Sequence, residues 1–217
     1  AKAEHGSYDV RGCLDCNWKG LYPYPNQGFI REFSASNEEQ FPFYDEDFEW
    51  KLFLTRRYLM DGDEVLHIGT CPPALWDKFK AEKIEVTVVD PFDEQGLENL
   101  PAEKFDAAFV WNTLDYVADP KHTCELVRNS LKENAFVATQ IRDCGSTLNK
   151  KKQVNTFQSG HCNFFEREHI VKLFSDSFGS VPTSVLFDKY GESSVVSFGR
   201  LSAVSDLKPE MLPLICV

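Results

Sequence analysis

Hydrophobic and polar positions change their spacing along the chain, and the spacing predicts alternating strands and helices from residue 45 onward. Two short apolar runs, at residues 64–68 and 84–89, are typical of buried strands. Between them, residues 74–80 have the spacing of a short amphipathic helix with Leu75 and Phe79 on one face. The second run ends on Asp90, so this strand–helix–strand unit closes on a carboxylate.

The same reasoning predicts the remaining elements. The expected helices span 45–59, 119–132 and 165–177, and the expected strands span 105–110, 135–141, 180–190 and 193–204. We expect the last two strands to form an antiparallel pair that closes the sheet. Residues 91–104 are too few for a full helix and strand, so either residues 96–100 stand in for a strand or one crossover is absent.

This order of elements indicates an α/β protein with a doubly wound, Rossmann-like, mostly parallel sheet and a C-terminal antiparallel strand. The sheet is expected to be abbreviated after its second strand. We divide the chain into an irregular N-terminal appendage, residues 1–44, and one domain, residues 45–217.

Asp90 and the turn at Gly69 suggest a nucleoside site. A carboxylate that follows the second strand of such a unit accepts hydrogen bonds from ribose hydroxyls. The turn contains Pro72 and Pro73, which lack the backbone N–H groups that bind a pyrophosphate. A nucleoside without phosphate therefore suits the turn better than NAD or ATP, although a turn with no ligand remains open.

Composition narrows the range of partners. A hydrophobic content of 42% supports a buried core, and a net charge of −11 argues against nucleic acid or an anionic membrane as partner. No run approaches transmembrane length. Seven cysteines without a disulfide framework indicate a reducing compartment, so we expect a cytoplasmic protein. Because the chain begins with Ala1, it is expected to be a processed form or one domain of a larger polypeptide.

Cys13 and Cys16 have the spacing of half a zinc site. No second pair follows nearby, and His5 alone is a poor ligand candidate. We therefore expect no bound metal, unless residues upstream of this chain complete the site.

Several segments, in order, resemble class I S-adenosylmethionine-dependent methyltransferases, in particular the branch that acts on sugars and small molecules. The residues that carry the resemblance are Cys13-x-x-Cys16 followed by LYPYP, which is similar to an N-terminal cysteine knuckle, then VLHIGTCPP, Asp90, LPAEKFDAAFVWNTLDYVADP, LKENAFVATQI and GHCNFFEREHIVKLFSDSFG. No single segment is specific, but together they cover most of the chain.

The resemblance implies S-adenosyl-L-methionine as cofactor and a set of residues that contact it. These are His67, Gly69, Thr70, Cys71, Asp90, Pro91, Phe92, Leu97, Glu98, Trp111 and Asn112. Three features depart from the family. His67 replaces an acidic residue that orients the methionine amino group, Cys71 and Pro73 replace glycines, and the segment that supplies an adenine-contacting acid is shortened to residues 96–99. Trp111 fits the protein core equally well.

The implied reaction is methylation of a small-molecule or glycan acceptor, with O-methylation of a sugar hydroxyl preferred. A sugar hydroxyl is a weak acid, so a base is expected near the strand ends. The candidates are Asp115, Asp143 and His161, and His161 together with Asp143 is the preferred pair. Each has a structural alternative: Asp115 could cap or salt-bridge a helix, Asp143 could form a turn, and His161 could pack on Phe164.

Two other functions remain open. The prolines, His67 and the shortened segment favour a degenerate, non-catalytic methyltransferase-like binding or scaffolding domain. A dinucleotide-dependent enzyme is disfavoured because of the turn at Gly69.

Overall fold

The computed structural model describes residues 9–12, 18–26, 28, 30, 45–69, 73–145, 162–179, 182–189, 192–201 and 215–216. Thr70, Cys71, His161, Cys13 and Cys16 lie outside these residues, and so do the predictions made for them.

Seven strands form the main sheet in the order β10-β8-β9-β6-β5-β3-β4. Strands β3, β4, β5 and β6 run parallel, β9 is antiparallel to both β6 and β8, and β10 pairs in parallel with β8. Their bounds are β3 Glu64–Ile68, β4 Glu85–Val89, β5 Phe105–Trp111, β6 Leu131–Arg142, β8 Thr183–Lys189, β9 Glu192–Arg200 and β10 Ile215–Cys216. The mostly parallel α/β sheet and its antiparallel closing pair are confirmed.

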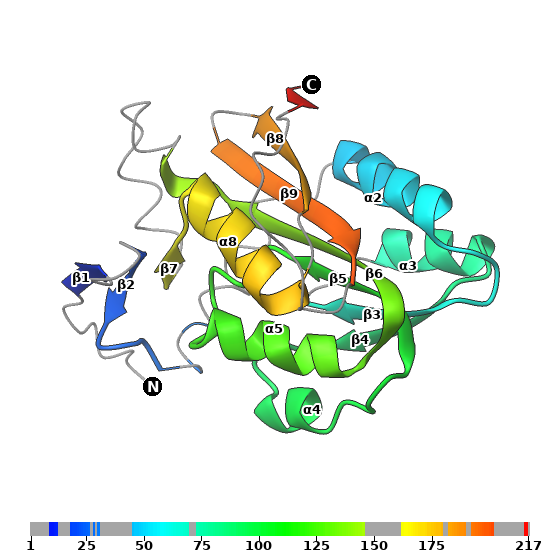
Figure 1. Ribbon diagram of the computed structural model, residues 1–217, viewed down its shortest axis with the longest axis horizontal. Helices are drawn as coiled ribbons and strands as arrows, with labels where there is room; N and C mark the ends of the chain where they lie inside the picture. The colour runs from blue at the N-terminus through cyan, green and yellow to red at the C-terminus, as the bar shows by residue number, and fades with distance from the viewer. Residues whose placement is uncertain are drawn as a thin grey trace.

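Helices cover both faces of this sheet (Figure 1). On one face lie α4 Glu94–Glu98, α5 Pro120–Asn129 and α8 Arg167–Phe178, and on the other lie α2 Asp45–Tyr58 and α3 Pro73–Ala81. Alternate residues of each strand enter the two cores: Leu66 and Ile68 of β3 pack toward α5 and α8, whereas Val65 packs toward α2 and α3. The four predicted helices are present with nearly the predicted bounds.

Local sequence sets where two helices begin and end. The Asp119 side chain accepts a hydrogen bond from the His122 backbone N–H, and Pro120 occupies the first turn of α5. Gly179 ends α8 in the left-handed conformation, with φ of 64°. One predicted boundary was wrong: α5 stops at Asn129, and β6 begins at Leu131, where the helix was expected to continue to residue 132.

The segment after β4 decides between the two alternatives left open by the sequence. Residues 94–98 form the single-turn helix α4, capped by Asp93, and no strand follows before β5. The segment between β4 and β5 therefore lacks one crossover, and among the described strands β4 lies at an edge of the main sheet.

A second, small sheet joins the N-terminal segment to the region before α8. It contains β1 Asp9–Gly12, β2 Lys19–Tyr22 and β7 Asn163–Phe164, in the order β1-β2-β7. The expectation of an irregular N-terminal stretch missed these strands. Strands of two to four residues are too short to show a recognisable pattern, and the pairing of β2 with β7 joins residues more than 140 positions apart.

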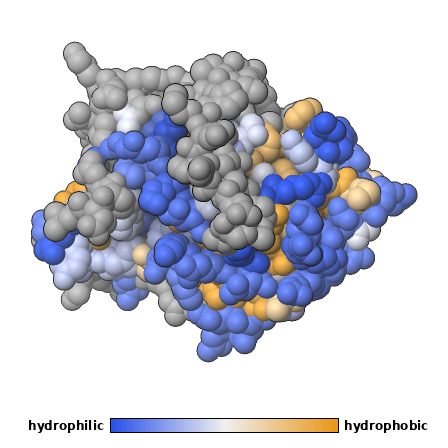
Figure 2. Space-filling view, in the orientation of Figure 1, coloured by the Kyte–Doolittle hydropathy of each residue, from blue (hydrophilic) through white to orange (hydrophobic). Residues whose placement is uncertain are grey.

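The surface in the view of Figure 2 is mainly hydrophilic, with hydrophobic residues exposed in small groups. Within the part of the chain that the structure describes, every helix is too short or too polar to span a bilayer. Cys124, Cys144 and Cys162 are buried thiols that form no disulfide, as expected for core cysteines.

Candidate functional site

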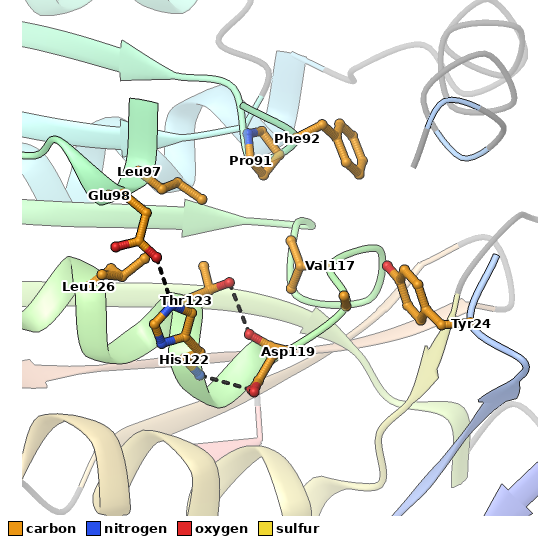
Figure 3. Close-up of a pocket in the computed structure, with 11 residues that line it drawn as sticks. Tyr24, Pro91, Phe92, Leu97, Glu98, Val117, Asp119, His122, Thr123 and Leu126 are labelled. Atoms are coloured by element: carbon orange, nitrogen blue, oxygen red, sulfur yellow. Dashed lines mark hydrogen bonds and ion pairs between the residues drawn. The ribbon is translucent and has the colours of Figure 1, made fainter. Parts of the chain in front are cut away.

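A pocket of about 300 Å³ opens at the carboxyl ends of β4 and β5. Pro91 and Phe92 line it from the loop after β4, and Leu97 and Glu98 line it from α4 (Figure 3). Carboxyl ends of parallel strands are where open α/β sheets bind ligands. Four residues predicted to contact the cofactor are thus brought together in one cavity.

The opposite wall comes from the loop after β5 and the start of α5. It contains Val117, Ala118, Asp119, His122, Thr123 and Leu126, and Tyr24 adds an aromatic ring from the segment after β2. The His122 imidazole lies 3.0 Å from a carboxylate oxygen of Glu98, which joins α5 to α4 across the pocket rim. This hydrogen bond to Glu98 raises the pKa of His122.

Asp90 lies directly before this wall, at the end of β4. It is partly exposed, and one of its carboxylate oxygens accepts a hydrogen bond from the Phe92 backbone N–H at 2.9 Å. This bond fixes the loop that carries Pro91 and Phe92 into the pocket. The carboxylate is therefore held at the strand tip, but the pocket lining does not include it, and ribose binding by Asp90 stays a prediction.

Gly69, at the end of β3, has a conformation and surroundings that no other residue type fits. Its φ is +104°, and a Cβ atom at this position would lie 2.5 Å from the Thr113 hydroxyl and 3.3 Å from the Trp111 carbonyl oxygen. Thr113 in turn donates to the backbone carbonyls of Trp111 and Ile68, at 2.9 and 3.3 Å. The turn is a tight junction between the ends of β3 and β5.

His67 lies on the other face of the sheet, under α2. It is fully buried, and neither ring nitrogen has a hydrogen-bond partner. Burial, together with the positive charge of Lys51, lowers the pKa of His67 to about 3, so the ring is neutral at physiological pH.

Two more buried polar side chains share this face at the strand ends. Trp111 is 4% exposed and packs in the core against Phe109, with the Lys51 ammonium 5.1 Å from its ring centroid. The indole N–H and the Gln140 carbonyl oxygen also lack hydrogen-bond partners. Of the two placements open for Trp111, its side chain takes the core position. Asn112 follows with an exposed side chain and a φ of 47°.

Asp115 is buried in the loop after β5, on the α5 side. Its side chain is shielded from solvent, one carboxylate oxygen has no hydrogen-bond partner, and burial raises its pKa to about 7 against the opposing effect of Arg142. Carboxyls with a pKa near the working pH are effective general bases.

The small sheet holds this loop in place. The Asn163 side chain donates to the carbonyls of Leu114 and Val117, at 2.9 and 2.7 Å, and the Cys162 and Asn163 N–H groups donate to the Asp115 carbonyl. The Tyr24 hydroxyl donates to the Tyr116 carbonyl. Residues 162–163 and Tyr24 therefore cover the loop that carries Asp115.

Asp143 is also buried, at 3% exposure, just after β6. It accepts a hydrogen bond from the Gly145 N–H at 3.1 Å, which is the turn-forming contact that the sequence allowed as its alternative role. Among the described residues, no group of three or more histidine, cysteine or acidic side chains is arranged to hold a metal ion.

Sequence reasoning missed several residues at these sites. These are Lys51 of an expected helix and the strand-end residues Thr113 and Gln140. Only tertiary packing brings Lys51 near His67, Thr113 against Gly69 and Gln140 beside Trp111. One signal was available: Gln140 is a polar residue inside the apolar run AFVATQI, at the carboxyl end of a strand.

A family model described as a methyltransferase domain matches residues 43–179. The chain belongs to this methyltransferase family. Membership confirms the methyltransferase class that the resemblance implied, with S-adenosyl-L-methionine as the methyl donor. A comparison with curated protein sequences finds no match.

Solved structures with low sequence identity share the fold. One is a methyltransferase from Thermotoga maritima, described as a possible histamine N-methyltransferase, with a TM-score of 0.54 and 19% identity over 82% of this chain and 100% of that chain. Another is the 1,6-didemethyltoxoflavin N1-methyltransferase of Burkholderia thailandensis, solved with S-adenosylhomocysteine, with a TM-score of 0.58 and 12% identity over 90% of this chain and 100% of that one. The N-methyltransferase NodS of Bradyrhizobium japonicum was also solved with S-adenosylhomocysteine. It has a TM-score of 0.56 and 14% identity over 82% of this chain and 100% of that chain.

Proposed function

We propose that this methyltransferase binds the nucleoside part of its methyl donor in the pocket at the ends of β4 and β5. The observation that carries the proposal is the convergence of Pro91, Phe92 and Leu97 in one cavity directly beyond Asp90. Apolar walls suit a flat base, and a carboxylate at the strand tip suits ribose hydroxyls. At Gly69 the backbone lies so close to Thr113 that the turn has no space for a side chain.

The proposed acceptor is a small molecule or glycan, and the preferred nucleophile is a sugar hydroxyl. When bound, S-adenosyl-L-methionine supplies an electrophilic methyl group. The protein must then orient the acceptor and remove a proton from it. Asp115 is the proposed base, because its raised pKa allows it to take up a proton near neutral pH. Asp143 and His161 remain secondary candidates for the same role.

Access to Asp115 is a condition of this proposal. Its carboxyl group is 1% exposed beneath Tyr24 and the strand pair β2–β7, so an acceptor reaches it only when these segments move aside. A nitrogen acceptor is the competing choice, supported by the N-methyltransferases among the structural relatives. An acceptor panel that contains both amines and sugars, read by mass spectrometry, separates the two.

The donor site is tested by titration calorimetry with S-adenosylhomocysteine and S-adenosylmethionine. Wild-type protein should bind both, and Asp90→Ala should lose on the order of 2 kcal/mol of affinity, since the charge-assisted hydrogen bonds to the ribose disappear. Glu85→Ala removes an exposed acid at the opposite end of the same strand and should leave affinity unchanged. Absence of binding heat with either ligand, at millimolar concentration, contradicts the proposal.

A second function is supported by the region around His67. A neutral, unpartnered histidine beside a buried lysine differs from the acid that the family places there to bind an ammonium group. This favours a non-catalytic domain that has kept the fold for binding or scaffolding. Formation of a methylated product from any acceptor in the panel would exclude it.

A further inference from the structure

The outer edge of β4 has backbone groups that no described strand uses. The Glu85 N–H donates to the Asp63 carbonyl, and the Val89 carbonyl accepts from the Gly69 N–H, so these two residues face β3. In a parallel pair, residues that bond to the neighbouring strand alternate with residues that face away from it. Val86 and Val88 therefore direct their N–H and C=O groups outward.

This edge lacks the residues that usually protect an edge strand. Natural sheets use lysine, proline, bulges or very short strands to prevent the addition of another chain. Strand β4 reads EVTVV, with five residues of which four are β-branched and none is proline or lysine. The opposite edge of the sheet is β10, which has only two residues. Of the two edges, β4 is the one built to accept a further strand.

Charges around the edge indicate what kind of strand fits. Glu85 is exposed at the start of β4, and Asp90 and Asp93 follow its end. The nearby Lys83 ammonium is held by Asp61 at 2.8 Å, so it does not offset these acids. With a net charge of −11, a second copy of this chain is repelled. A short β-forming segment with basic residues at both ends is complementary in charge to the acids at the two ends of β4.

We propose that the outer edge of β4 binds an extended, basic segment of a protein partner as an added strand of the main sheet. Main-chain hydrogen bonds to Val86 and Val88 supply the affinity, and the acids at the two ends of β4 select for lysine or arginine. The absent crossover after β4 leaves this edge without a described partner strand. Asp90 also belongs to the proposed donor site, so the test reads the backbone amides of β4 and not methyl transfer.

Amide hydrogen exchange measured by NMR tests this on the whole chain. The probe is a synthetic peptide, Lys-Val-Thr-Val-Lys, and the control peptide carries glutamate in place of both lysines. We expect the basic peptide to slow exchange at the Val86 and Val88 amides by roughly tenfold or more at saturation. The acidic peptide should have no effect.

A pair of proline variants separates edge binding from damage to the fold. Val88→Pro removes an outward N–H, which edge strands tolerate, so the thermal midpoint should be nearly kept while protection of Val86 by the basic peptide is lost. Thr87→Pro removes an N–H that faces β3, so it should lower the thermal midpoint markedly. Equal protection by both peptides, or by the basic peptide in Val88→Pro, overturns the proposal. Protection of the Val86 and Val88 amides in the protein without peptide also overturns the proposal. If that protection rises with protein concentration, a second copy of the chain occupies the edge. If it does not, another segment of the same chain occupies it.

Discussion

The regions around His67 and Asp115 lie near the same ends of the parallel strands, but on opposite faces of the sheet. Each buries an ionisable side chain with a polar atom that has no hydrogen-bond partner. Under α2, His67 is kept neutral because it loses its proton, with a pKa lowered to about 3. Under the small sheet, burial favours the protonated form of Asp115 and raises its pKa to about 7, so the carboxyl group exists in both protonation states near neutral pH.

The difference teaches what each region is able to do. A group with a pKa near 3 does not exchange protons near neutral pH, so His67 is suited to hydrogen bonding rather than acid–base chemistry. A group with a pKa near 7 does exchange them, so Asp115 is suited to act as a base. Burial alone is therefore not a sign of function. The His67 and Asp115 regions differ in whether the pKa of the buried group lies far from neutral pH or near it.

The largest expected effect concerns His67. Because its folded-state pKa lies below the unfolded value, it contributes stability that is present above pH 6.5 and is lost as the pH falls toward 3. The difference in unfolding free energy between wild type and His67→Gln should change by roughly 1.4 kcal/mol per pH unit in this window, on the order of 5 kcal/mol in total. Urea unfolding at several pH values measures it, and a difference independent of pH would contradict the neutral ring.

Asp115 should give the opposite slope. Its folded-state pKa is raised, so its contribution is present below about pH 4 and is lost as the pH rises through 7. Relative to Asp115→Asn, wild type should lose on the order of 4 kcal/mol between these values, because the variant carries a neutral group throughout. The same urea series measures this. A parallel pH response of the two proteins would show that the carboxyl is already ionised in the fold.

Substitution at the Gly69 turn should have a smaller effect on stability. Gly69→Ala combines a strained backbone, at φ of +104°, with a Cβ placed 2.5 Å from the Thr113 hydroxyl, and should cost roughly 2–4 kcal/mol. Gly62→Ala is the matched control, because Gly62 has φ of +89° but nothing within 4 Å of the added atom. Chemical denaturation of both variants isolates the steric part. Equal losses would mean that the β3–β5 junction is not tight.

The smallest effect is expected at the pocket rim. His122 and Glu98 are both more than half exposed, so His122→Gln should cost only about 0–1 kcal/mol of stability. Because Glu98 raises the pKa of His122, the contribution is present at low pH and is lost as the pH rises through that pKa. Thermal unfolding at pH 5 and pH 8 should show a difference only at pH 5. A difference confined to pH 8 would contradict this sign.

Much of the fold was predictable because local patterns carried it. The short apolar runs gave the strands, and Asp119-Pro120 and Gly179 marked helix ends through capping chemistry that acts within a few residues. The strands β1, β2 and β7 were missed because two to four residues are too short to show a periodic pattern, and β7 pairs with a strand more than 140 positions away. Distance along the sequence explains why Lys51 was not connected with His67, nor Gln140 with Trp111.

The candidate site divides in the same way. Pro91 and Phe92 were predicted as cofactor contacts because they follow Asp90 directly in the sequence, and the strand end places both at the pocket wall. The other wall, from Val117 to Leu126, was not found, because which helix faces α4 depends on how the layers pack. The sequence alone determined the order of strands and helices, the carboxylate at the tip of β4 and the donor-poor turn. Only the tertiary structure decided which polar groups lose water and which pKa values move, because burial depends on contacts between distant segments.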